Sequence, residues 1–180
     1  MNNPVISVIL ARQSVREYQP RQLTPEELDA LIQCALRAPS GRNAQPCHVR
    51  FCQNAAMLRE MQVDFKNIVG WDTPVHTRSD TNPFYHNAPT FVFLFAEGDS
   101  RADAGIMAEN LCVAAQGLGL GTCIVASVGA LFADEVRGAK WRAALEIPAG
   151  YLFQLGVCVG EPGESPEWKP RRPAQIRVIE

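Results

Sequence analysis

Two short stretches carry residue types that bind anions and planar, hydrogen-bonding ligands. The first is Arg12-Gln13-Ser14-Val15-Arg16, which directly follows an apolar segment. Two arginines with a serine between them can present a fork of donors to an anion. The alternative is ordinary: Arg12 interacts with the carbonyl end of the preceding helix, and Arg16 is solvated.

The second stretch, residues 38–46, reads APSGRNAQP and is bounded by two prolines. Proline fixes its own φ and restricts the residue before it, so we expect a rigid loop. Gly41 can supply a positive φ or let a ligand approach the backbone closely. The loop also holds three short hydrogen-bonding side chains, Ser40, Asn43 and Gln45. It therefore suits a planar ligand, although the same residues are typical of a surface turn between a helix and a strand.

Length and composition favour one folded domain. The chain has 180 residues, of which 47% are hydrophobic and 20% are charged, enough for a sizeable core. A net charge of -2 argues against a protein whose main partner is nucleic acid. No apolar window is long enough to span a bilayer, and the N-terminus lacks the pattern of a secretory signal. We therefore expect a cytoplasmic protein without membrane partners.

Cysteine and histidine give no sign of a disulfide framework or a metal site. The chain has six cysteines without a Cys-x-x-Cys pair, and most lie in apolar runs, where cysteine behaves as a small hydrophobic residue. The three histidines have no ligand spacing. These residues are Cys34, Cys47, Cys52, Cys112, Cys123 and Cys158, with His48, His76 and His86.

The elements that must position the two stretches can be predicted from capping and periodicity. An apolar helix beginning near Pro4 is expected to be largely covered. A capping box of Thr24 and Glu27 opens a second helix that ends near Arg37. Further helices are predicted at 55–68, 102–116 and 134–145, and the one at 102–116 is apolar enough to be buried in the domain or against a partner subunit.

Strands are predicted at 48–53, 90–96, 121–127 and 151–160, with 90–96 buried on both faces. The glycines at 117–121 follow a helix, so they predict a helix-ending turn and not a dinucleotide-binding loop. Residues 70–89 form a long loop with several aromatic residues, typical of a lid or of disorder. The proline-rich segment 161–180 cannot fold on itself, and we expect it to lie on another subunit.

Four stretches, in order, resemble motifs of the nitroreductase family of FMN-dependent oxidoreductases. They are RQSVR at 12–16, APSGRNAQP at 38–46, NLCVAAQGLGLGTC at 110–123 and KPRRP at 169–173. The resemblance implies an α+β fold: a three-layer α/β/α sandwich around a mainly antiparallel sheet. It also implies a single domain over 1–180, whose extended C-terminal arm, 160–180, is exchanged in a homodimer with FMN in two interface clefts.

Carried over residue by residue, the resemblance implies a set of cofactor-binding residues. The FMN phosphate would be held by Arg12, Ser14, Lys169 and Arg171, with a further contact from Gln13. Arg16 would lie by flavin N1 and O2, and the ring would be bordered by Pro39, Ser40, Asn43 and Gln45. One flavin face would lie against Ile124, Val125, Ala126 and Ser127, with the Ala126 amide near N5. Basic groups from both ends of the polypeptide would thus converge across two protomers.

The chain departs from the family pattern at two positions. Cys47 stands where the family often has Trp, and Gln13 stands where it often has Arg or His. The loop 70–89 matches no family motif, and we expect it to influence substrate choice. No metal ligand and no obligatory side-chain acid or base is assigned.

The activity implied by the resemblance is a ping-pong reaction. NAD(P)H, the co-substrate, would pass hydride to flavin N5, and a small-molecule acceptor would then take it: a nitroaromatic, a quinone or an activated alkene. The alternatives are a flavin-binding or regulatory module without turnover, a flavin-destroying or dehalogenating branch of the scaffold, and an interaction protein built on a degenerate scaffold.

Overall fold

A four-stranded antiparallel sheet forms the centre of the molecule, a computed structural model that describes residues 3–72, 83–172 and 176–179. The strand order is β1-β2-β4-β3. The strands are β1 (Cys47–Cys52), β2 (Thr90–Glu97), β3 (Gly121–Val125) and β4 (Tyr151–Gly160). The α+β prediction and the mainly antiparallel sheet are confirmed. His76 lies outside the described residues.

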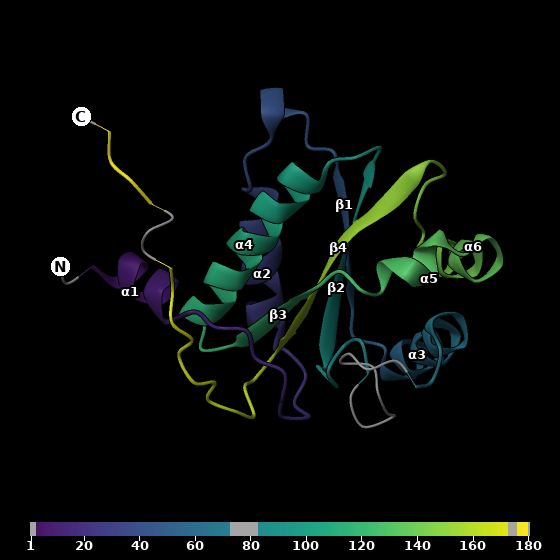
Figure 1. The fold of residues 1–180 in the computed structure, drawn as a ribbon, viewed down its shortest axis with the longest axis horizontal. Helices are drawn as coiled ribbons and strands as arrows, with labels where there is room; N and C mark the ends of the chain where they lie inside the picture. Colours follow the sequence, from purple (N-terminus) through teal and green to yellow (C-terminus); the bar gives the residue numbers. More distant parts are fainter. Residues whose placement is uncertain (1–2, 73–82, 173–175, 180) are drawn as a thin grey trace.

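Helices cover both faces of this sheet (Figure 1). One face packs against α2 (Pro25–Leu36) and α4 (Arg101–Gly117), and α1 (Pro4–Ala11) lies outside α4. The other face packs against α3 (Ala55–Val69), α5 (Gly129–Ala133) and α6 (Glu135–Ala144). Among the described residues, no helix combines the length and the apolar character needed to cross a membrane.

The central strand β2 separates two hydrophobic cores. Its residues from Thr90 to Ala96 are all buried, as the unbroken apolar run predicted. Phe91, Phe93 and Phe95 belong to the core beneath α3 and α5. Val92 and Leu94 belong to the core beneath α2 and α4. This strict alternation follows from the period of two in a strand.

Local signals set the helix starts. Thr24 and Glu27 form the predicted capping box at the start of α2. The Asn54 side chain accepts a hydrogen bond from the Met57 amide at 3.0 Å and caps α3. Asp134 caps α6 in the same way. Such caps satisfy amides that have no partner within the helix.

Two turns differ in how well they could be predicted. At the end of α4, Gly119 takes a φ of 76° and the Leu120 amide donates to the Ala115 carbonyl, which confirms the predicted helix-ending turn. The predicted strand 121–127 ends two residues early, at Val125, because the chain turns there: the Gly129 amide donates to the Ala126 carbonyl. This turn leads into α5, a five-residue helix that was not predicted.

The prediction that the first helix is largely covered is wrong for the single chain. Val5, Ile9 and Leu10 on α1 are 61%, 49% and 63% exposed. No residue of α1 is buried, because α1 packs on the rest of the chain mainly through α4. The apolar character of α1 therefore has no sufficient explanation within one chain.

The described end of the aromatic loop is part of the core. Phe84 and Tyr85 are buried, and the Phe84 ring packs edge-on against Phe91 and Phe65. These aromatic residues are therefore core residues, and the lid or disorder predicted for 70–89 is wrong for them. Residues 73–82 of that loop lie outside the described part of the chain.

Candidate functional site

Segment 14–19 lies between strand β3 and the beginning of the C-terminal arm. The Val15 amide donates to the Thr122 carbonyl at 2.8 Å. On the other side, the Gly163 amide donates to the Glu17 carbonyl at 2.7 Å, and the Gln19 amide donates to the Glu161 carbonyl at 2.9 Å. The two ends of the chain are thus joined by backbone hydrogen bonds.

Close packing holds this segment in place. A Cβ at Gly121 would lie 2.9 Å from the Val15 side chain, so only glycine permits the observed approach. Val15 is buried, and its carbonyl accepts a hydrogen bond from the Tyr18 hydroxyl at 2.6 Å. Burial raises the pKa of Tyr18 well above its usual value, which keeps the hydroxyl a donor. The residues before and after Val15 are therefore presented from a rigid support.

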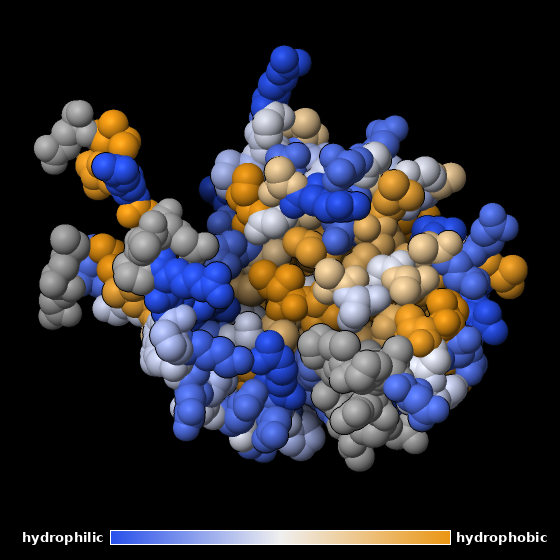
Figure 2. All heavy atoms as spheres, viewed as in Figure 1, coloured by the Kyte–Doolittle hydropathy of each residue, from blue (hydrophilic) through white to orange (hydrophobic). Residues whose placement is uncertain are grey.

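A basic cavity of about 190 Å³ opens where the two ends meet. Four cationic side chains line it together with Gln13, Ser14, Pro166 and Glu167; the cations are Arg12, Arg16, Lys169 and Arg171. The space-filling view shows strongly hydrophilic side chains gathered on this side of the molecule (Figure 2). The predicted phosphate-binding residues are therefore brought together, as are Gln13 and Arg16.

Three further contacts hold Arg12 and Arg171 at the cavity. Arg12 Nε lies 3.7 Å from Glu109 Oε1 on α4, and the Arg12 side chain is only 23% exposed. The Arg171 guanidinium lies over the Trp168 ring, 5.5 Å from its centre. The Arg12 backbone amide donates to the Val8 carbonyl at the end of α1. Arg12 thus closes the helix with its backbone and reaches the cavity with its side chain.

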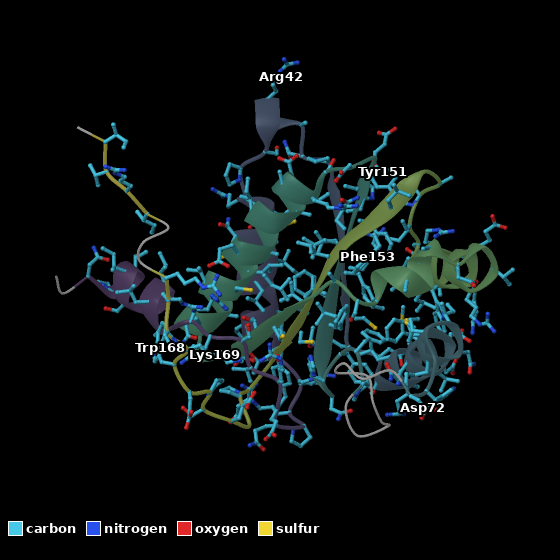
Figure 3. The ribbon with its side chains drawn as sticks, viewed as in Figure 1. Arg42, Asp72, Tyr151, Phe153, Trp168 and Lys169 are labelled. Carbon is cyan, nitrogen blue, oxygen red and sulfur yellow. The ribbon has the colours of Figure 1, made fainter. Side chains whose placement is uncertain are left out.

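Next to the cavity, the end of β3 offers an exposed apolar surface. Ile124 is 43% exposed, and Ala126 and Ser127 are exposed as well, whereas Val125 is buried. Figure 2 shows apolar side chains over β3 and the turn that follows it, beside the hydrophilic cluster. On β4, Leu152 is exposed and Phe153 is half-buried (labelled in Figure 3). An anion site therefore adjoins a surface suited to a flat, apolar group.

The loop 38–46 lies elsewhere on the chain. The Gly41 amide donates to Asp103 near the start of α4, and the Gln45 amide donates to the Ser40 hydroxyl at 2.9 Å. In Figure 3, Arg42 of this loop and Lys169 of the basic cavity lie beyond opposite ends of α4. Within one chain, the loop residues that were predicted to border the ring therefore do not meet the basic cavity. The residues concerned are Pro39, Ser40, Asn43 and Gln45.

Gly41 does not adopt the positive φ that was considered for it. Three other residues of the loop do: Arg42, Asn43 and Gln45, at 53°, 57° and 48°. Left-handed conformations of such residues each cost about 1–3 kcal/mol and are kept only where the surroundings impose them. The two bounding prolines and the Ser40 and Asp103 hydrogen bonds impose them here.

Basic groups from both ends of the chain already converge within one protomer, and their expected convergence across two protomers stays a prediction. The arm leaves β4, pairs with segment 14–19 and brings Lys169 and Arg171 to Arg12 of the same chain. A second copy is not needed to build the basic cavity.

The sequence model of the nitroreductase family matches residues 9–161. The chain belongs to the nitroreductase family. It is similar to an NADPH-flavin oxidoreductase of Vibrio harveyi, with 29% identity over 100% of this chain and 74% of the relative. An FMN reductase (NADPH) of Bacillus subtilis is 27% identical over 97% of this chain and 72% of the relative.

Solved structures give the same family. A nitroreductase with bound FMN from Bacteroides fragilis has a TM-score of 0.90 and 26% identity, covering 99% of this chain and 100% of the other. An FMN-dependent nitroreductase from Clostridium difficile has a TM-score of 0.85 and 29% identity, with coverage of 99% and 100%. The predicted family is confirmed.

Several residues that contact the lining of the basic cavity were not predicted from the sequence. Glu109 pairs with Arg12, the Glu164 side chain accepts a hydrogen bond from the Arg16 amide, and Trp168 stacks on Arg171. Glu109 carried a signal, because it belongs to the thin polar stripe of an otherwise apolar helix. Glu164 carried none, since its partner Arg16 lies far away in the sequence. Trp168 and Arg171 are only three residues apart, but they lie in a segment without a helical or strand period.

Proposed function

We propose that this chain is an FMN-dependent NAD(P)H oxidoreductase that passes hydride to a nitroaromatic, a quinone or an activated alkene. The basic cavity built by both chain ends, directly beside the exposed end of β3, is the observation that carries the proposal. The relatives named as NADPH-flavin oxidoreductase and FMN reductase support it.

The donors of the cavity fit the phosphate of FMN. A phosphate dianion has three oxygens that accept charge-assisted hydrogen bonds, and arginine forks match them in pairs. Arg12, Lys169 and Arg171 would supply the charge, and Ser14 and Gln13 would supply neutral donors. Glu167, also at the cavity, moderates the local positive charge. The net charge of the lining remains positive, as an anion site requires.

The flat ring of the cofactor would lie on the exposed end of β3. Ile124 would contact one face, and the chain from Ala126 to Ser127 would supply a backbone amide at the ring edge. Arg16 would face the pyrimidine side of the ring, where negative charge develops when the ring accepts hydride. Bound FMN would supply the hydride acceptance and donation, and the chain would supply binding, orientation and electrostatics.

We further propose that the working form is a homodimer in which a second copy brings its loop 38–46 over this ring. The exposed apolar residues of α1 support this, as does a groove of about 650 Å³ that Ile9, Cys34 and Val113 help to line. Residues 176–179 extend away from the body of the chain (Figure 1). Ile176, Val178 and Ile179 are about four-fifths exposed, which suits an arm that lies on a second copy.

The test uses the purified full chain. We expect a yellow protein with the absorbance of bound FMN and a mass in size-exclusion light scattering of two chains. Anaerobic NADPH or NADH should bleach it, and menadione or a nitrofuran should restore the colour. A protein that binds FMN but is never bleached would instead be a flavin-binding or regulatory module. A protein that stays colourless with added FMN would refute the proposal.

A further inference from the structure

Arg42 is the only charged residue of the loop 38–46 and stands at its tip. Its side chain is exposed and points away from the body of the chain (Figure 3). Among the ion pairs of the described residues, none includes Arg42. The left-handed backbone at Arg42 is thus held in place to present a cation that the chain itself does not neutralise.

The rest of the loop directs its backbone donors inward. The Gly41 amide donates to Asp103, and the Gln45 amide donates to the Ser40 hydroxyl. The amides of Asn43 and Ala44 donate to the carbonyls of Ser40 and Gly41, both at 3.0 Å. Four of the five backbone amides from Gly41 to Gln45 therefore donate within the chain, and the fifth is that of Arg42 itself. Arg42 is thus the charged group that the loop offers to an approaching anion.

The cofactor phosphate does not account for this cation. Four other cationic side chains line the basic cavity, and Arg42 lies beyond the opposite end of α4 (Figure 3). In the proposed homodimer, the loop lies over the ring of the other copy, where the hydride donor and the acceptor must stack. The surface there is apolar, formed by Ile124, Ala126 and Phe153. Arg16 would face the edge of the ring, so Arg42 would be the cation above its face.

We propose that Arg42 binds an anionic group, phosphate or carboxylate, on the molecule that stacks on the ring in the second copy. The inference rests on the proposed function and adds a substrate class to it. Two sources fit the same chemistry: the 2′-phosphate of NADPH, and a carboxylate on the electron acceptor. Both would make charge-assisted, bidentate hydrogen bonds with a guanidinium.

The experiment compares ligands with and without one additional anionic group in the two half-reactions of Arg42→Gln, Arg42→Lys and the FMN-loaded native protein. The first arm measures flavin reduction by NADPH and by NADH in an anaerobic stopped flow. The second arm measures reoxidation by 4-nitrobenzoate and by its neutral methyl ester. Arg59→Gln, which removes an exposed cation on α3, is the matched control for the change in net charge.

In each arm we take the ratio of second-order rate constants for the ligand with the additional anionic group over the ligand without it: NADPH over NADH, and 4-nitrobenzoate over its methyl ester. We expect Arg42→Gln to lower this ratio by tenfold or more in at least one arm. A fall with NADPH alone assigns the anion to the hydride donor, and a fall with nitrobenzoate alone assigns it to the acceptor. Arg42→Lys should keep most of the preference, and Arg59→Gln all of it. Ratios within twofold of the native protein in both arms would overturn the inference while leaving the proposed function intact. A colourless protein would instead overturn the proposed function.

Discussion

Arg12→Ala tests the basic cavity most directly, because Arg12 lies between the cavity and Glu109. Losing one charged hydrogen bond to a phosphate costs about 1.5–3 kcal/mol. The variant also leaves Glu109 without its partner at 3.7 Å, an ion pair worth about 1 kcal/mol in a dielectric near that of water. The water value applies because the Glu109 side chain is 52% exposed. This pair is present with and without FMN, so its loss lowers the stability of the fold and does not add to the loss of affinity. We therefore expect FMN affinity to fall by about 1.5–3 kcal/mol, or roughly 13- to 160-fold.

Flavin fluorescence titration measures this loss, and riboflavin provides the internal comparison because it lacks the phosphate. Arg12→Ala should leave riboflavin affinity unchanged, and its effect on FMN should shrink as salt is added. In the double variant Arg12→Ala/Glu109→Gln, part of the lost affinity should return, since the unpaired carboxylate no longer repels the phosphate. Equal losses for FMN and riboflavin would show that Arg12 acts on the fold, and the phosphate assignment would be refuted.

Two other features of the chain give direct predictions. Gly121→Ala places a methyl group 2.9 Å from Val15; we expect a loss of about 1–3 kcal/mol in urea unfolding and weaker FMN binding. Adding Val15→Ala should recover part of both, and a wild-type midpoint for Gly121→Ala alone would contradict the packing argument. Burial raises the pKa of five thiols, Cys47 among them. Only Cys34 and Cys47 are not fully buried, so at pH 8 only these two should react with a thiol reagent before unfolding, Cys47 slowly. Mass spectrometry should therefore find at most two labels per native chain; the protected thiols are Cys52, Cys112, Cys123 and Cys158.

Features set by residues near one another in the sequence were predicted well. The capping box at Thr24 and Glu27 and the cap at Asn54 are local, and so is the unbroken apolar run of β2. Their outcomes depend on a few adjacent residues, so the sequence alone carries the information. The short helix α5 was missed because five residues are too few to show a helical period.

The arrangement of the site depended on contacts between distant segments. Motif resemblance grouped the residues that we expect to serve one ligand, but it could not say which of them one chain brings together. That division depends on segment 14–19 pairing with β3 and with the start of the arm. Arg12, Lys169 and Arg171 therefore share a cavity, while Ser40 and Asn43 do not join them.

This division predicts that cofactor binding and turnover can be separated. One chain already builds the basic cavity, whereas the loop over the ring would come from a second copy. Ile9→Ser with Leu10→Ser removes apolar surface that the single chain leaves about half exposed, so folding should be preserved. In light scattering we expect this variant to be monomeric, with FMN affinity within about tenfold of the native value and turnover with NADPH lost. A monomer that turned over at the native rate would show that the loop of a second copy is not required. A monomer unable to bind FMN would show that the basic cavity is insufficient within one chain.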